Sequence, residues 1–250
     1  MGFLTVSNNE GLATLTISRG KVNAFSEPLV DEFSTCFRDM ESDPSVKAVI
    51  LRGTGSFFSF GFDIPEFLNY SKDEFTRFLT KFSALCDQVY LFPKPVVAAL
   101  NGHTIAGGCL LAMTCDCRVM VKGKAKIGLN EITFGAPMFT GGVEMLRSLV
   151  GDRNAERILL LGAMYPAEEA LAMNLVDEAV EEADFEERVK TVALELARKD
   201  SEPYRIVKWL LRKPIVRKMA DGAQESLREF VDVWYSESTW TKLRQIKIHG

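Results

Sequence analysis

Residues 96–114 have the sequence VVAALNGHTIAGGCLLAMT, and this stretch decides the fold class of the chain. Val96–Leu100 is a short, continuous apolar run, which is typical of a fully buried strand. Gly107–Thr114 is equally apolar, and we expect it to form a short helix that begins at the tight turn Ala106-Gly107-Gly108. A buried strand followed closely by a helix indicates an α/β protein, in which helices pack on a sheet.

The segments around this stretch continue the alternation of strands and helices. Apolar residues recur at helical spacing in residues 72–91, and Ser26 and Asp63 are well placed to cap the helices that follow them. From Gly142 onward we expect a nearly all-helical chain that is interrupted at residues 175–180. The sequence therefore predicts an α/β core at residues 1–195 and a C-terminal helical region at residues 196–250. Further strands are expected at residues 12–18, 46–52 and 118–121, and a further helix at residues 27–40.

The composition excludes several classes of function. Hydrophobic residues make up 47% of the 250 residues and the formal net charge is −4, which argues against a nucleic-acid footprint and a polybasic membrane patch. No apolar run reaches the roughly 18 residues of a membrane-spanning helix, and Met1–Asn9 lacks the features of a signal peptide. Five cysteines without a Cys-x-x-Cys pair, and only two histidines, argue against a metal site. We expect a cytoplasmic protein with no metal, nucleic-acid or membrane partner.

Two glycine-containing turns and one glutamate form the candidate site. The turns are Phe58–Asp63, with Gly61, and Ala106–Leu110, with Gly107, and each can aim backbone N–H groups at one point. Glu131 follows and could supply a base, because apolar neighbours would desolvate its carboxylate. Those neighbours are Ile132, Phe134, Met138 and Phe139. Taken singly, each feature is also compatible with an ordinary turn or a solvated acid.

Five motifs span nearly the whole chain. They are Val22-Asn23-Ala24-Phe25, Phe58-Ser59-Phe60-Gly61-Phe62-Asp63-Ile64, Ile105-Ala106-Gly107-Gly108-Cys109, Cys115-Asp116-Cys117-Arg118 and Gly128-Leu129-Asn130-Glu131. Together they give the chain a resemblance to the crotonase superfamily, the enoyl-CoA hydratases and isomerases. The resemblance implies a crotonase-like spiral core of ββα units with a C-terminal trimerisation region. It also implies a homotrimer, or a dimer of trimers, that acts on an acyl-CoA thioester and needs no further cofactor.

The resemblance assigns roles to single residues. The N–H groups of Phe62 and Gly107 would hold the oxygen of an enolate, and Glu131 would be the catalytic acid–base. From its place on the last helix, Lys242 could reach a CoA phosphate of a neighbouring subunit, or it could be a plain surface lysine. The predicted CoA- and substrate-binding residues are Lys21, Val22, Ala24, Phe60, Gly61, Asp63, Ile64 and Lys242.

Position 110 narrows the predicted chemistry. The family's hydratases carry a second glutamate directly after the Gly-Gly-Cys of the second turn, where this chain has Leu110. Hydration commonly uses two groups, whereas one carboxylate can shift a double bond by removing a proton from C2 and returning one at C4. The pattern is therefore most similar to the Δ3,Δ2-enoyl-CoA isomerases of fatty-acid β-oxidation. The dienoyl-CoA isomerases of the family carry a further aspartate, where this chain has Phe139.

Other interpretations stay open from the sequence. Glu131 with a bound water could make the chain an enoyl-CoA hydratase or a CoA-ester hydrolase, and a non-catalytic acyl-CoA-binding protein is the alternative outside enzymes. Glu144 is a second candidate acid, although it fits better as a favourable charge in the first turn of a helix. His103 is expected to be a turn or core residue. We expect the aromatic residues of the C-terminal tail to mark a subunit interface; they are Phe230, Trp234 and Trp240.

Overall fold

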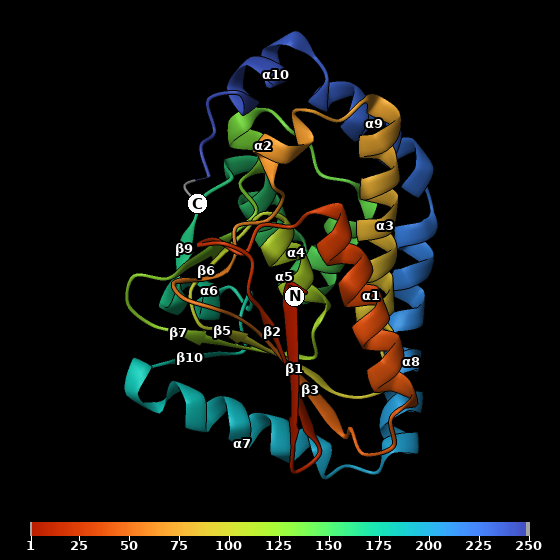
Figure 1. Cartoon of the computed structure of the whole chain (residues 1–250), viewed down its shortest axis with the longest axis vertical. Coiled ribbons are helices and arrows are strands. Elements are labelled where there is room, and N and C mark those ends of the chain that lie inside the picture. The colour runs from red at the N-terminus through yellow and green to blue at the C-terminus, as the bar shows by residue number, and fades with distance from the viewer. Residues whose placement is uncertain (1, 249–250) are drawn as a thin grey trace.

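The computed structural model describes residues 2–248, so the outermost residues of the two predicted regions, 1 and 249–250, lie outside the described residues. The strands form two sheets (Figure 1). The larger sheet has the strand order β1 (Leu4–Asn9), β2 (Leu12–Ile17), β3 (Ala48–Gly53), β5 (Val96–Leu100), β7 (Cys117–Val121) and β10 (Glu178–Val180). The smaller sheet has the order β4 (Phe57–Ser59), β6 (His103–Ile105), β8 (Lys126–Gly128) and β9 (Tyr165–Pro166).

Most strand pairs in both sheets are parallel. In the larger sheet β1 pairs antiparallel with β2, and the remaining neighbours are parallel. In the smaller sheet β4, β6 and β8 are parallel, and β9 runs antiparallel to β8. The chain thus repeats one unit three times: a strand in the larger sheet, a strand in the smaller sheet, and a helical segment. These ββα units confirm the predicted α/β core.

The helices cover the sheets and lie at both ends of the molecule. In Figure 1, α7 runs below the larger sheet, whose strands β2, β3, β5 and β7 it contacts, while α9 and α10 lie at the opposite end. The helix α8 packs on α5, and α9 packs on α3. The helical segments are α1 (Glu27–Ser42), α2 (Ile64–Phe67), α3 (Lys72–Tyr90), α4 (Gly107–Thr114), η1 (Glu131–Phe134), α5 (Thr140–Leu161), α6 (Ala167–Ala172), η2 (Glu182–Asp184), α7 (Phe185–Ala197), α8 (Ser201–Ala220), α9 (Ala223–Trp234) and α10 (Glu237–Leu243). Residue 195 lies in the last turn of α7, and the division of the chain there stays a prediction.

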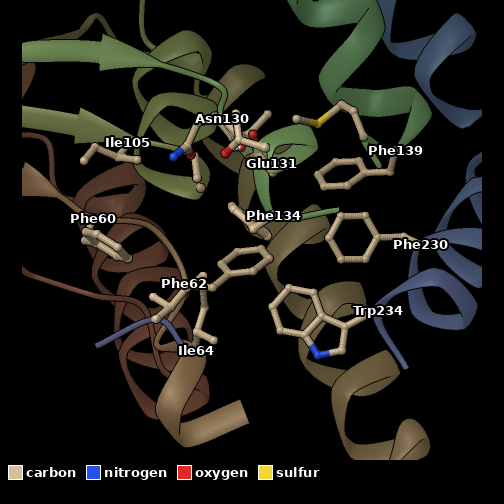
Figure 2. Close-up of a pocket in the computed structure, with 16 residues that line it drawn as sticks. Phe60, Phe62, Ile64, Ile105, Asn130, Glu131, Phe134, Phe139, Phe230 and Trp234 are labelled. Atoms are coloured by element: carbon tan, nitrogen blue, oxygen red, sulfur yellow. Dashed lines mark hydrogen bonds between the residues drawn. The ribbon is translucent and has the colours of Figure 1, made fainter. Parts of the chain in front are cut away.

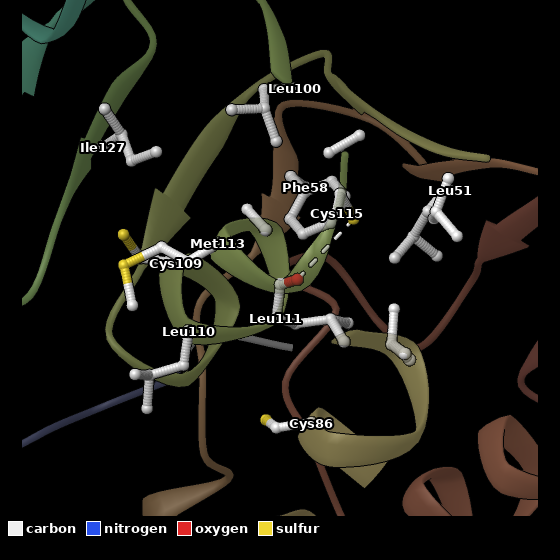
Figure 3. Packing of buried hydrophobic residues seen from close by; sticks show 14 of the residues in the cluster. Leu51, Phe58, Cys86, Leu100, Cys109, Leu110, Leu111, Met113, Cys115 and Ile127 are labelled. Carbon is white, nitrogen blue, oxygen red and sulfur yellow. Dashed lines mark hydrogen bonds between the residues drawn. The ribbon is translucent and has the colours of Figure 1, made fainter. Parts of the chain in front are cut away.

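The helix α4 lies at the centre of the hydrophobic core. Every residue of this helix is buried, because its sequence offers no polar face that could turn toward solvent. Figure 3 shows Leu110, Leu111 and Met113 of α4 among side chains from the strands of both sheets. The helix α4 is therefore held in place by side chains from both sheets.

One expectation for the C-terminal tail is wrong. Phe230 and Trp234 are only 2% and 1% exposed within a single chain, where Trp234 stacks on Phe75 of α3 with 4.5 Å between ring centroids. Trp240 is half-buried against Tyr235. These aromatic residues therefore need no neighbouring subunit, because the tail folds back on its own chain. Residues 2–248 contain no helix of the length and apolarity needed to cross a membrane.

Candidate active site

The small sheet brings the three predicted functional segments together. The turn with Phe62 follows β4, the turn with Gly107 follows β6, and Glu131 follows β8. These strands are parallel neighbours, so their carboxyl ends lie at the same edge of the sheet. Ligands of α/β proteins commonly bind at such an edge. Segments that are separated by tens of residues in the sequence therefore meet at one place.

The first turn leaves one backbone N–H without a protein partner. Its other amides donate within the protein: Phe60 to the carbonyl of Val22 (2.8 Å), Gly61 to Ser59 Oγ (3.0 Å), Asp63 to the carbonyl of Phe25 (2.9 Å) and Ile64 to the carbonyl of Phe62 (2.9 Å). No hydrogen bond among residues 2–248 uses the N–H of Phe62. Since backbone amides are nearly always paired when buried, this one is available to a ligand.

The second turn offers a donor in the same way. The N–H of Ala106 is bound to the carbonyl of Gly128 at 2.9 Å, and the N–H of Gly107 has no partner in the described part of the chain because it is the first residue of α4. Ala106 has a φ of +50°, which an alanine rarely adopts. Such strain persists only where the surroundings impose it, and it often marks a functional site.

The two turns touch each other, and both glycines are required for the contact. Gly61 has a φ of +97°, and a Cβ atom there would lie 2.9 Å from the Gly107 nitrogen. A Cβ atom on Gly107 would lie 2.9 Å from Cε1 of Phe62. The N–H groups of Phe62 and Gly107 therefore belong to neighbouring turns, as an oxyanion hole requires.

Glu131 is a buried carboxylate beside this pair. It is the first residue of η1, its side chain is 7% exposed, and its Oε2 atom has no hydrogen-bond partner among the described residues. Burial raises the pKa of Glu131 from 4.5 to about 7. A carboxylate with this pKa can both take and return a proton near neutral pH.

The turns and Glu131 share one aromatic cavity of about 260 Å³. Figure 2 shows Phe60 and Ile105 on one side of Glu131, and Phe139, Phe230 and Trp234 on the other. Glu131 is the single carboxylate among the described residues that line it. The lining residues are Phe60, Phe62, Ile64, Ile105, Ala106, Gly107, Leu110, Asn130, Glu131, Thr133, Phe134, Met138, Phe139, Phe230, Trp234 and Ile246. Of the predicted apolar neighbours of Glu131, Ile132 is the exception, because it is 45% exposed.

A separate groove of about 690 Å³ adjoins the cavity at Phe60, which lines both. The predicted CoA-binding residues Lys21 and Val22 line this groove, and so does Lys247, which the sequence did not single out. Lys242 lies elsewhere: it is exposed and close to Gly135, beyond η1. Ala24 is buried, and its carbonyl accepts a hydrogen bond from Arg19 at 2.9 Å.

The remaining acidic and histidine candidates have other partners. Glu144 pairs with Arg147 at 3.1 Å and does not line the cavity. His103 lies in β6, where its Nδ1 accepts a hydrogen bond from the N–H of Lys126 at 3.2 Å. Asp63 caps α2, as expected, by accepting from the N–H of Glu66 at 3.2 Å.

Sequence reasoning missed the aromatic wall that α9 contributes to the cavity. Phe230 and Trp234 were expected at a subunit interface, and they line the cavity of their own chain. The sequence carries no direct signal for this, because an amphipathic helix does not indicate which surface it covers.

The chain resembles known proteins over almost its whole length. The model of the enoyl-CoA hydratase/isomerase family matches residues 7–241. A probable enoyl-CoA hydratase of Bacillus subtilis is 30% identical, over 95% of this chain and 92% of its own length. The mitochondrial enoyl-CoA delta isomerase 1 of Rattus norvegicus is also 30% identical, over 88% of this chain and 77% of its own length. The crystal structure of human mitochondrial Δ3,Δ2-enoyl-CoA isomerase aligns with a TM-score of 0.92 at 26% identity, covering 97% of this chain and 95% of that one. This likeness confirms the crotonase-like fold.

Proposed function

Since the chain belongs to the enoyl-CoA hydratase/isomerase family, we propose that it converts a 3-enoyl-CoA into the trans-2-enoyl-CoA. The observation that carries this proposal is that Glu131 is the single carboxylate among the described residues that line the cavity, with Leu110 lining the same space where a second acid would be needed for hydration. Leu110 is 1% exposed and can neither activate water nor deliver a proton.

The proposed reaction moves one proton and one double bond. Glu131 removes a proton from C2 of the substrate, and the electron pair of that C–H bond forms an enolate of the thioester. The N–H groups of Phe62 and Gly107 hold the enolate oxygen, and one such donor is worth on the order of 10²–10³ in rate. The protonated Glu131 then returns the proton at C4, which places the double bond between C2 and C3. No atom is gained or lost, and no cofactor beyond the coenzyme A of the substrate is needed.

The groove beside Phe60 is the proposed route of the coenzyme A moiety. The groove meets the cavity at Phe60, which is where we place the thioester of the substrate. The exposed side chains of Lys21 and Lys247 in the groove can attract the CoA phosphates. The aromatic cavity beyond Glu131 then receives the acyl chain. This assignment gives a phosphate contact to Lys247 of the same chain, and the contact of Lys242 with the CoA of a neighbouring subunit stays a prediction.

We also propose that the chain acts in the cytoplasm as a homotrimer or a dimer of trimers. Several apolar side chains on α8 are strongly exposed, which supports an interface between copies of the chain. These side chains, here called the α8 apolar face, are Ile206, Val207, Trp209, Leu210 and Leu211.

The activity is tested by the ultraviolet absorbance of the conjugated enoyl thioester. With a panel of 3-enoyl-CoA substrates this absorbance should rise, and with crotonyl-CoA it should change little. Glu131→Gln should bind coenzyme A and lose about 10²–10⁴-fold in rate, as is typical when an acid–base group is removed. Rapid loss of the crotonyl-CoA absorbance with the unmodified protein would indicate a hydratase or a CoA-ester hydrolase and contradict the isomerase proposal. No change with any substrate would indicate a binding protein.

A further inference from the structure

Arg19 joins the first turn to the loop that precedes α1. Its guanidinium donates to Asp63 Oδ2 at 2.6 Å, to Glu66 Oε2 at 2.9 Å and to the carbonyl of Ala24 at 2.9 Å. The Arg19 side chain is 19% exposed and Asp63 is 18% exposed, so this ion pair is shielded from solvent. A charge-assisted hydrogen bond of this kind is stronger than one between neutral groups and fixes the geometry of the groups it joins.

The loop that Arg19 anchors is itself rigid because of Asn23. Asn23 is fully buried, and its side chain donates to the carbonyls of Thr54 and Phe57 at 3.0 and 2.9 Å. Its Oδ1 accepts from the N–H of Arg19 at 3.1 Å. Its own carbonyl accepts from Ser59 Oγ at 2.8 Å. Arg19 therefore connects a fixed frame to the residues that follow Phe62.

No hydrogen bond among residues 2–248 uses the N–H of Phe62, so its direction is set by its own planar peptide group, which includes the carbonyl of Gly61. That carbonyl accepts from the N–H of Phe25 at 2.6 Å, and the N–H of Asp63 donates to the carbonyl of Phe25 at 2.9 Å. Phe25 belongs to the loop 19–25 that Arg19 anchors. Asp63 is in addition held by Arg19 at its side chain. If that side chain is released, the start of α2 can shift, and the N–H of Phe62 shifts with it.

We propose that Arg19 is a positioning residue of the oxyanion hole, which aims the Phe62 N–H at the substrate oxygen by holding Asp63 and Glu66 against the loop 19–25. This inference rests on the proposed function, because it assigns the Phe62 N–H to an enolate. Arg19 does not line the cavity, so it acts through Asp63 and not by touching the substrate. A displacement of about 1 Å in an oriented group can cost on the order of 10² in rate.

The test compares Arg19→Gln with Asp63→Asn and with the control Arg52→Gln. Asp63→Asn removes the charge that Arg19 binds and keeps a good helix cap, so it remains informative if Arg19→Gln folds poorly. Arg52 makes a similar pair of hydrogen bonds, to Glu186 at 2.8 Å each, on a surface away from the cavity. Each variant is assayed for kcat and KM with a 3-enoyl-CoA, for affinity to free coenzyme A, and for the enolisation of a bound 3-oxoacyl-CoA followed by its ultraviolet absorbance.

We expect Arg19→Gln to lower kcat by about 10- to 10²-fold with little change in coenzyme A affinity. The apparent pKa of the bound 3-oxoacyl-CoA should rise toward its value in solution, because the enolate loses a well-aimed donor. Asp63→Asn should also lower kcat and raise the apparent pKa of the bound 3-oxoacyl-CoA, and Arg52→Gln should change neither kcat nor this pKa. A purely stabilising role for Arg19 would leave the enolisation unaffected in the folded variant.

The possible failures are distinct. If the unmodified protein lowers the apparent pKa of the 3-oxoacyl-CoA and the folded Arg19 and Asp63 variants lower it equally, the role of Arg19 is overturned and the oxyanion hole stands. If the unmodified protein leaves that pKa unchanged, the oxyanion hole itself is wrong, and with it both proposals.

Discussion

At the scale of single residues, the site depends on a carboxylate that must ionise in an apolar cavity. Glu131 has no cation beside it among the cavity residues, and its Oε2 has no hydrogen-bond donor among residues 2–248. Desolvation is therefore the main cause of its raised pKa. The same cost that makes Glu131 a good base should also destabilise the folded chain when Glu131 is charged.

This cost predicts that Glu131→Gln stabilises the protein in a pH-dependent manner. The pKa of Glu131 is raised from 4.5 to about 7, so the folded state holds the proton more tightly than the unfolded state. Stability is therefore lost as the pH rises between these two values, and the loss is complete above about pH 7. A shift of this size corresponds to about 3 kcal/mol. In denaturant unfolding, the free energies of unfolding of Glu131→Gln and of the unmodified protein should be nearly equal at pH 4.5 and should differ increasingly up to pH 8. A difference in free energy that stays constant across this range would contradict the assignment.

Leu110 allows a second test of the one-carboxylate argument. Leu110→Glu places an acid in the cavity that Glu131 lines, and we expect weak hydration of crotonyl-CoA that the unmodified protein lacks. Leu110→Gln is the matched control, because glutamine has nearly the shape of glutamate but no acidic proton. Equal hydration by both variants, measured by loss of the enoyl-thioester absorbance, would show that the added acid is not the cause.

At the scale of secondary-structure elements, the proposed oxyanion hole lies where two turns touch, and a side chain placed there should disturb both turns. In Gly107→Val a Cβ atom would approach the Phe62 ring to 2.9 Å, so the two N–H groups should separate. We expect kcat to fall on the order of 10²-fold, with a smaller change in KM, because the charge on the oxygen grows toward the enolate.

Gly141→Ala is the control for this prediction, since its Cβ would have only ordinary contacts, the shortest at 3.5 Å to Phe139. Circular dichroism and coenzyme A binding would show that Gly107→Val is folded. A near-normal kcat in that folded variant would place the oxyanion hole elsewhere.

The elements that the sequence predicted are the long or strongly apolar ones. The helix at 107–114 has the predicted bounds, and α3 ends one residue before the predicted 72–91. The strands β4, β6 and β8 were not predicted, because three residues are too few to show a periodic pattern. Yet these short strands bring the functional turns to one edge. The sequence motifs pointed to the turns and to Glu131, but only the fold shows that these segments lie next to one another.

Side chains that act across long sequence separations were also beyond prediction. Arg19 contacts Asp63 and Glu66, 44 and 47 residues away, and nothing in the local sequence indicates this pairing. The burial of Trp234 likewise depends on where α9 packs, which the amphipathic pattern leaves open. The two turns could be located in the sequence because their close approach leaves no room for a Cβ at Gly61 or Gly107, and their role as an oxyanion hole stays a prediction.

At the scale of the whole molecule, the proposed function gives the C-terminal helices two separate tasks. The helix α9 lines the aromatic cavity of its own chain with Phe230 and Trp234. The helix α8 packs on α5 and leaves the α8 apolar face exposed, with Leu210 and Leu211 at 62% and 69%. Monomeric proteins rarely expose contiguous apolar patches of this kind. Closing the active site and joining the subunits should therefore be separable by mutation.

We predict that Trp209→Glu combined with Leu210→Glu disrupts assembly and leaves the fold of each chain intact. Both side chains are exposed, at 42% and 62%, and glutamate is a good helix former, so α8 itself should persist. The new charges would have to be buried without partners in an interface, which is costly. Light scattering should give the unmodified protein a mass of three or six chains of 27.9 kDa, and it should give the variant a mass closer to that of one chain.

Val6→Glu is the control. Val6 lies on the edge strand β1 and is 50% exposed, and because edge strands tolerate charge, this variant should keep the mass of the unmodified protein. A variant that keeps its full mass would move the interface away from α8, and an unmodified protein of one chain would contradict the trimer itself.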